Sequence, residues 1–279
     1  MFASNPFAEI SASIAPAVMQ WYVVAMIVLV IAGTLFDVIH KGSAKYFFEN
    51  MRSSKGKGAR PVGGGELMSI AVQTGVVDVL TSGEFCNQRR RLAHLLTMYG
   101  FVLYLVTTVI MIFGYPTPAT PAPAIVAALW WLGALMVCVG GYWFWFFIRV
   151  DVAAEGKPAL RVMRADLFVI SLMVSATLGL IWAALQVNGS AGAGLFFVLY
   201  IIATTVLFAG VPWSKFAHMF FKPAAAFEKR VSEANGTAAN LPTQTRDDPE
   251  QQQRHSMELL RDAPMNMGLG IKREAPRHY

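Results

Sequence analysis

Three histidines carry the side chains best suited to hold a metal or move a proton: His40, His94 and His218. His94 follows three consecutive arginines in the stretch RRRLAHLLTMYGF, residues 89–101. Imidazole is a common metal ligand, and its charge changes near neutral pH. The histidines could therefore ligate a metal or transfer a proton. Which of the two is possible depends on where the predicted helices place them.

The composition indicates an integral membrane protein. Of the 279 residues, 55% are hydrophobic and 14% charged, whereas about a quarter are charged in soluble domains. The two cysteines, Cys86 and Cys138, form no C-x-x-C motif, so we expect no cysteine-ligated zinc or iron–sulfur site within this chain. We also expect no nucleic-acid partner.

Five apolar runs predict an all-α membrane protein with five transmembrane helices. A spanning helix needs about 20 apolar residues. The runs cover residues 19–39, 92–115, 124–148, 167–187 and 195 to at least 213. Residues 1–18 carry one charge, Glu9, and lack the basic stretch of a cleavable signal peptide, so we expect them to remain as an external segment.

The basic residues orient these spans. Nine Lys or Arg lie in the loop 41–91, four lie between spans three and four, and ten follow span five. The amino terminus and the other two connections carry none, so the positive-inside rule places the amino terminus outside and the carboxyl terminus in the cytoplasm. We expect a multi-pass protein of the bacterial inner membrane, with Trp21, Trp130 and Trp131 in its outer aromatic belt.

The cytoplasmic parts divide into three. Residues 41–65 are basic and glycine-rich, and we interpret them as a flexible loop. Residues 66–80 have helical spacing, which predicts an amphipathic helix on the inner membrane surface, on a partner or on the bundle's own end. Its apolar face would hold Leu67, Ile70, Ala71, Thr74, Val77 and Leu80, and its other face Glu66, Gln73 and Asp78. The membrane domain would end at residue 223, and residues 224–279 are polar enough to be disordered or to fold on a partner.

The five-span topology places the three histidines at one depth. At about 1.5 Å per residue, His40 and His218 lie roughly 31 and 34 Å from the starts of their spans, near the inner edge of a hydrocarbon core about 30 Å thick. A lone interfacial histidine most simply reaches the headgroups. His94 and His218 make a stronger case as a pair, because two imidazoles on different helices suit the axial positions of a b-type haem. Basic residues that could pair with its propionates lie on the same side: Arg89, Arg90, Arg91 and Lys215.

Two stretches resemble a known family. VVDVLTSGEFCNQRRRLAHLLTMYGFVLY (76–104) and PWSKFAHMFFKP (212–223) are similar to the membrane cytochrome b subunits of the nitrate reductase gamma type. The resemblance covers roughly residues 19–223, and within the group the membrane anchor of adenylylsulfate reductase from sulfur oxidisers is the closest. It implies that His94 and His218 bind an inner haem. The outer ligand positions fall near Tyr104 and Tyr200, so the resemblance does not support a second haem.

One inner haem implies a quinone site near the inner face. Asp37 and His40, three residues apart on one helix, are its candidates for proton handling; the alternative is an interfacial ion pair. The aromatic run 141–147 would stack a quinone ring or anchor the inner interface.

We therefore expect a membrane anchor that carries electrons between a cytoplasmic iron–sulfur flavoenzyme, adenylylsulfate reductase, and the quinone pool. The loop 41–91 and the carboxyl-terminal tail would dock the enzyme, and anionic lipid is an equally good partner for the basic inner face. The chain shows no residues for substrate chemistry of its own. A cofactor-free structural anchor is the alternative, and a transporter is a third interpretation that the scarcity of charge within the spans disfavours.

Overall fold

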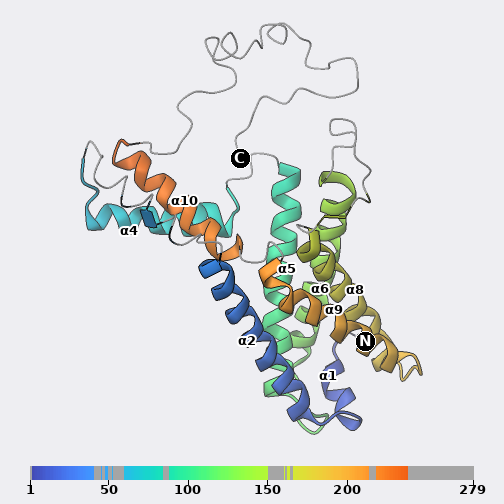
Figure 1. The fold of residues 1–279 in the computed structure, drawn as a ribbon. Helices are drawn as coiled ribbons and strands as arrows, with labels where there is room; N and C mark the ends of the chain where they lie inside the picture. The colour runs from blue at the N-terminus through green and yellow to red at the C-terminus, as the bar shows by residue number, and fades with distance from the viewer. Residues whose placement is uncertain are drawn as a thin grey trace, which may run out of the picture. The chain divides into compact units, whose positions relative to one another are not determined.

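The computed structural model is helical (Figure 1). It describes residues 2–40, 45, 48–49, 52, 60–83, 88–149, 160, 162–163, 166–213 and 218–237. All regular elements in these ranges are helices, which confirms the predicted all-α class. The chain divides into two compact units: residues 1–42, 92–146 and 162–218 form the first, and residues 43–91, 147–161 and 219–279 the second.

Among the described residues, four helices are long and apolar enough to cross a membrane. They are α2 (Pro16–His40), α5 (Gln88–Gly114), α6 (Ala124–Trp143) with its π-helical continuation η3 (Phe144–Ile148), and α8 (Leu167–Val187). Each coincides with one of the first four apolar runs. The chain is therefore a membrane protein, as its composition predicts.

The fifth apolar run forms a shorter helix than the sequence predicts. Helix α9 (Ala193–Ala209) has 17 residues, and a short 3₁₀ helix, η5 (Val211–Trp213), follows it. Gly210 and Pro212 explain the break, because glycine is a poor helix former and a proline disfavours the α conformation of the residue before it. Residues 210–213 are still apolar, although the α-helix has ended at Ala209.

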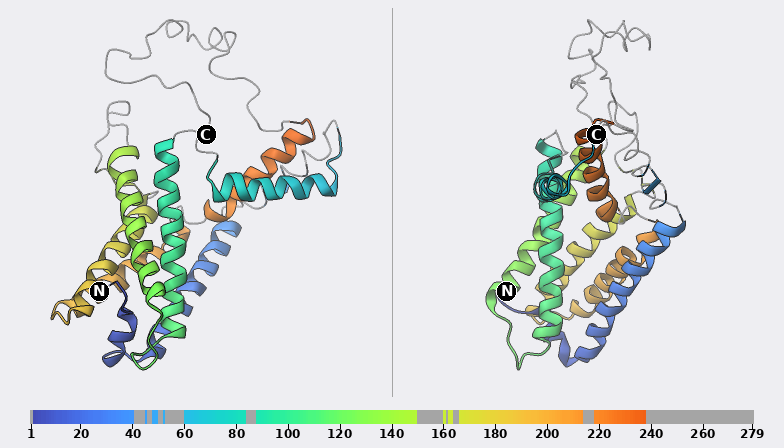
Figure 2. Two further views of the ribbon diagram at one scale, coloured as in Figure 1. Left: turned by 180° about the vertical axis from the view of Figure 1, so that it is seen from behind. Right: turned by 90° about the vertical axis from the view of Figure 1, so that its left-hand side faces the viewer.

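Glycines bring α5 and α6 into close contact in the first unit, where the two helices run beside each other (Figure 2). A Cβ atom at Gly100 would lie 2.8 Å from the carbonyl oxygen of Gly133, and one at Gly140 would lie 2.8 Å from the carbonyl oxygen of Ala93. Small residues at such positions let backbones approach, which is how helices associate in lipid. This contact holds the first turns of α5 in place.

Two groups of buried side chains form the core of the first unit. One contains Phe101, Val137, Leu172 and Leu207, together with Val211 of η5. The other is mainly aromatic and includes Tyr104, Trp130, Trp182, Phe197 and Tyr200. It also contains Phe7 of the short amino-terminal helix α1 (Pro6–Glu9).

The predicted outer aromatic belt is only partly correct. Trp21 is exposed, as expected of a belt residue, but Trp130 and Trp131 are buried. The ring of Trp130 packs edge-on against Phe7 and Trp131, and its indole nitrogen donates a hydrogen bond to Thr108 Oγ1 at 2.8 Å. These two tryptophans therefore build the core instead of facing lipid.

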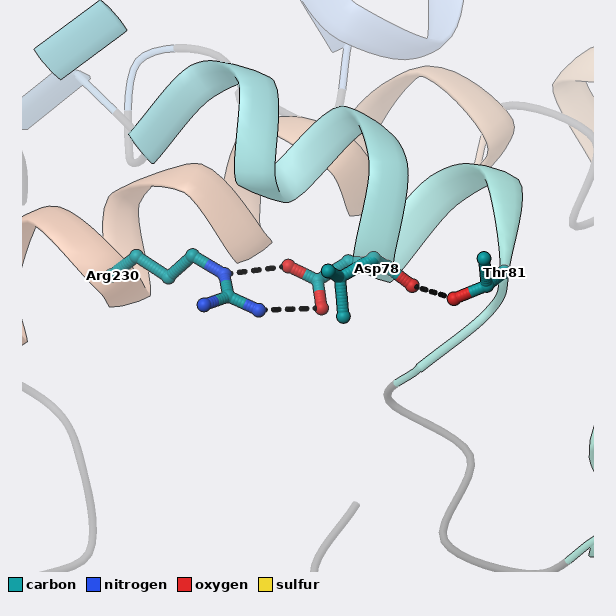
Figure 3. A network of polar contacts seen from close by, with 4 residues as sticks. Asp78, Thr81 and Arg230 are labelled. Carbon is teal, nitrogen blue, oxygen red and sulfur yellow. Dashed lines mark hydrogen bonds and ion pairs between the residues drawn. The ribbon is translucent and has the colours of Figure 1, made fainter. Parts of the chain in front are cut away.

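The described residues of the second unit include α4 (Gly64–Gln73), the π-helical turn η2 (Thr74–Leu80) and nearly all of α10 (His218–Ala234). The predicted amphipathic helix 66–80 corresponds to α4 and η2. Asp78 of η2 accepts hydrogen bonds from Arg230 Nε at 2.7 Å and Nη2 at 2.9 Å (Figure 3). Residues 224–234, which the sequence predicts to be disordered or to fold on a partner, lie in α10. They are ordered against a segment distant in sequence, because Arg230 binds Asp78. The boundary of the membrane domain at residue 223 stays a prediction. Residues 238–279 lie outside the described part.

Candidate cofactor site

His94 lies at the end of α5 that carries the arginines, and it is half-buried. Its neighbour Ala93 is almost fully buried, and the Ala93 carbonyl oxygen accepts a hydrogen bond from Thr97 Oγ1 at 2.9 Å. Gly140 of α6 packs on Ala93 and Thr97. His94 thus directly follows a residue of α5 whose backbone is in close contact with α6.

His218 is the first residue of α10. Its side chain lies outside the described residues, as do Lys215 and Cys86. The helix η5, which ends at Trp213, packs on α2, because a Cβ atom at Gly33 would lie 3.0 Å from Val211 Cβ and 3.1 Å from Pro212 Cδ. The pairing of His94 with His218 therefore stays a prediction.

The three arginines before His94 differ in environment. Arg89 and Arg90 are exposed, whereas Arg91 is partly buried, and its Nε donates a 2.7 Å hydrogen bond to the carbonyl oxygen of Thr81. Arg91 therefore ties the end of η2 to the first turn of α5. Arg89 and Arg90 place two exposed guanidinium groups at this end of the helix.

The described residues at this end of α5 supply part of what one b-type haem would need. His94 is an imidazole with partial burial, it begins an apolar helix, and it has guanidinium groups on its polar side. Among the described residues no group of three or more His, Cys, Asp or Glu could hold a metal ion. A haem held by two axial ligands would not need such a group.

Asp37 and His40 of α2 lie in different surroundings although they are three residues apart. Asp37 is only 5% exposed, whereas His40 is exposed and stacks on Phe36 with ring centroids 5.1 Å apart. Asp37 is one turn beyond Gly33, the residue that contacts η5. The buried hydroxyl of Thr34, on the same turn, has no hydrogen-bond partner among the described residues. Thr34 was missed at the sequence level, because nothing in an apolar run indicates which threonine is left unsatisfied.

The outer ligand positions are packed with aromatic side chains. The rings of Tyr200 and Trp182 stack with centroids 5.5 Å apart, and Tyr104 packs on Trp130 at 5.1 Å. A Cβ atom at Gly179 would lie 2.6 Å from the Tyr104 hydroxyl and 3.2 Å from Tyr200 Cε2. The two tyrosines therefore converge on one glycine of α8, and the residues present do not fit a haem between them.

The aromatic run 141–147 is divided between core and surface. Trp145 is buried, whereas Phe146 and Phe147 are exposed, and Tyr142 stacks on Phe146 with centroids 6.2 Å apart. The exposed rings are compatible with both the quinone-stacking and the interfacial-anchor interpretations.

Comparison with known proteins identifies a family. The model of the family described as citrate utilization protein B matches residues 69–239, which is more than half of the chain. The chain belongs to this family. The match contains His94, Tyr104, Tyr200 and His218, whereas α2 with Asp37 and His40 lies outside it. No curated protein and no solved structure matches the chain.

Proposed function

We propose that this member of the citrate utilization protein B family is a redox membrane anchor. It would hold a cytoplasmic iron–sulfur flavoenzyme, adenylylsulfate reductase, at the bacterial inner membrane and carry electrons between that enzyme and the quinone pool. The observation that carries the proposal is His94: a half-buried imidazole at the basic end of a helix of spanning length, fixed by glycine contacts with α6. The resemblance of residues 76–104 and 212–223 to the nitrate reductase gamma type supports the same assignment.

The proposed topology has five spans, with the amino terminus outside and the carboxyl terminus in the cytoplasm. Helix α9 has a length of about 26 Å and the three residues of η5 add about 6 Å, so the two together match a hydrocarbon core of about 30 Å. The distribution of Lys and Arg supports the orientation.

In the proposed site, His94 and His218 would hold a single b-type haem, which would supply one-electron transfer. Arg89, Arg90 and Lys215 neutralise its carboxylates. Quinone is the proposed membrane substrate, and its reduction to quinol takes up two electrons and two protons. Asp37 is the proposed proton donor, because its carboxyl group is buried on α2 near the same end of the bundle.

A reduced-minus-oxidised visible spectrum of the purified full-length protein tests the haem. We expect one b-type haem per chain, lost in His94→Ala and in His218→Ala. Tyr104→Phe and His40→Ala are the matched controls and should keep it. A wild-type protein from a haem-competent host without b-type bands would reject the haem and leave the second candidate, a cofactor-free anchor for the same kind of partner.

The family description raises a second physiological context. Its words refer to citrate utilization, so the docked enzyme should be tested with adenylylsulfate and with citrate. The soluble protein that co-purifies with the membrane chain should reduce adenylylsulfate. A partner that instead transfers electrons only in the presence of citrate would keep the redox anchor and replace adenylylsulfate reductase.

A further inference from the structure

The segment α4–η2 carries a row of exposed apolar side chains that neither the haem proposal nor the quinone proposal uses. Met68 is 67% exposed, Val72 58%, Val76 49% and Leu80 51%. Successive members are four residues apart, so they lie along one side of the helical segment. We call these four residues the apolar row.

The opposite side of the segment faces protein. Ile70 and Thr74 are buried, and Asp78 is held by Arg230 of α10. Two residues predicted on the apolar face, Ile70 and Thr74, thus point toward protein. Asp78, which was predicted on the other face of the helix, forms an ion pair with Arg230 on this same side. The apolar row therefore remains outside after the second unit has folded.

The end of α4–η2 is tied to a spanning helix. Arg91 belongs to the first turn of α5, and its Nε donates to the Thr81 carbonyl oxygen at 2.7 Å. Thr81 directly follows Leu80, the last residue of the apolar row. Because the apolar run of α5 begins at Leu92, this hydrogen bond joins the end of the row to the residue that directly precedes that run.

The charge distribution also fits a membrane surface. No residue from Leu67 to Val77 is charged. The next exposed cations along the chain are Arg89 and Arg90, which lie beside the entry of α5. Apolar side chains that enter the acyl boundary next to cations that reach phosphate groups are typical of interfacial helices. The 17 residues of α4 and η2 are too few to span.

We propose that α4–η2 is an interfacial helix that inserts Met68, Val72, Val76 and Leu80 into the lipid surface where α5 enters the membrane. The basic residues 89–91 favour a leaflet with anionic lipid. The inference requires that α5 crosses the membrane and does not depend on haem, quinone or a docked enzyme. It also implies that α4–η2 itself presents little surface to a soluble partner.

Spin-label accessibility in proteoliposomes tests the proposal. Single cysteines replace Met68, Val72 or Val76 in the full-length protein, with Cys86→Ser and Cys138→Ala as background. Ser69 and Gln73, which are exposed on the flank of the same helix, provide matched control positions. Vesicles of phosphatidylcholine and phosphatidylglycerol supply the membrane. Collision rates with oxygen, which concentrates in lipid, and with a water-soluble nickel complex are measured for each label.

We expect the ratio of oxygen to nickel accessibility to be high at positions 68, 72 and 76 and low at 69 and 73. Equal exposure of all five labels to the nickel complex would overturn the proposal and leave the row open to a soluble partner. Protection of the row from both reagents would also overturn it, in favour of contact with protein such as a second copy of the chain. An absorption spectrum of the same samples measures bound haem independently. The interfacial-helix proposal can therefore fail while the haem proposal holds, and the reverse is also possible.

Discussion

Asp78 accepts two hydrogen bonds from Arg230, a residue 152 positions away in the sequence. The Asp78 side chain is 9% exposed and that of Arg230 is 25% exposed. The pair is therefore shielded on both sides and has the two-pronged geometry that makes arginine–carboxylate contacts strong. It joins the segment before α5 to the helix that follows the membrane domain.

Asp78→Asn should loosen α10. The amide cannot accept two charge-assisted hydrogen bonds, and the guanidinium of Arg230 loses its counter-charge while partly buried. We expect the opening free energy of α10 to fall by about 1–3 kcal/mol. Hydrogen–deuterium exchange of the α10 amides in the full-length protein measures this loss.

The exposed ion pair between Lys45 and Glu49, at 3.9 Å, provides the control. Glu49→Gln should leave exchange in α10 unchanged, because exposed pairs contribute little. The exchanged pair, Asp78→Arg with Arg230→Asp, should recover part of the protection. Faster exchange in the double variant than in either single variant would contradict a direct interaction.

The helices of the second unit were predictable from the sequence, whereas the contacts between these helices were not. Helical spacing identifies α4–η2, but periodicity alone cannot say which side meets protein, so Asp78 was placed on the wrong face. The same limit applies to Trp130 and Trp131, since hydropathy indicates their depth in the membrane but not the direction of their side chains. In both cases the missing information is a contact between segments distant in sequence.

For the candidate site too, the sequence predicted which helix carries each residue but not how each side chain is surrounded. The apolar runs predicted the helix positions of His94 and Asp37. Spacing suggested that Asp37 and His40 share a face, but the first is buried and the second is exposed. The end of α9 at Ala209 was missed because Gly210 and Val211 keep the hydropathy high while backbone geometry ends the helix.

Asp37→Asn should slow quinone reduction more than His40→Ala does. Asparagine preserves the shape of the buried side chain but cannot release or take up a proton, and positioned acid–base groups contribute about 10²-fold or more. His40 is exposed and stacks on Phe36, so its loss should have a smaller effect. Steady-state quinone reduction by the assembled complex is the measurement. Unchanged rates in both variants would exclude this end of α2 from the quinone site.

Gly133→Ala should destabilise the contact between α5 and α6. The new methyl group would lie 2.6 Å from the backbone nitrogen of Tyr104 and 2.9 Å from the carbonyl oxygen of Gly100. Backbone atoms of a packed helix cannot move aside alone, so we expect a cost of about 1–3 kcal/mol. Unfolding in detergent by a chemical denaturant measures it.

Gly114→Ala is the control for this variant. Gly114 is the last residue of α5, and a Cβ atom there meets nothing within 4 Å, so its stability should change by no more than about 0.5 kcal/mol. Because Gly→Ala in a helix reduces the entropy of the unfolded chain and by itself stabilises, equal losses for Gly133→Ala and Gly114→Ala would contradict a specific effect of the helix contact.

Gly179→Ala should be destabilising, and Tyr104→Phe should partly rescue it. The added Cβ atom would lie 2.6 Å from the Tyr104 hydroxyl, while the next neighbour, Tyr200 Cε2, would be 3.2 Å away. Removal of the Tyr104 hydroxyl takes away the closest contact. The remaining contact, with Tyr200 Cε2, can be relieved by small shifts of the ring. A double-mutant cycle on unfolding free energies should therefore give a favourable coupling of about 0.5–3 kcal/mol between the two substitutions. Tyr104→Phe alone keeps both aromatic rings in place. Additive effects of the two changes would therefore mean that the Tyr104 hydroxyl and Gly179 are not in contact, which would contradict the convergence of Tyr104 and Tyr200 on this glycine.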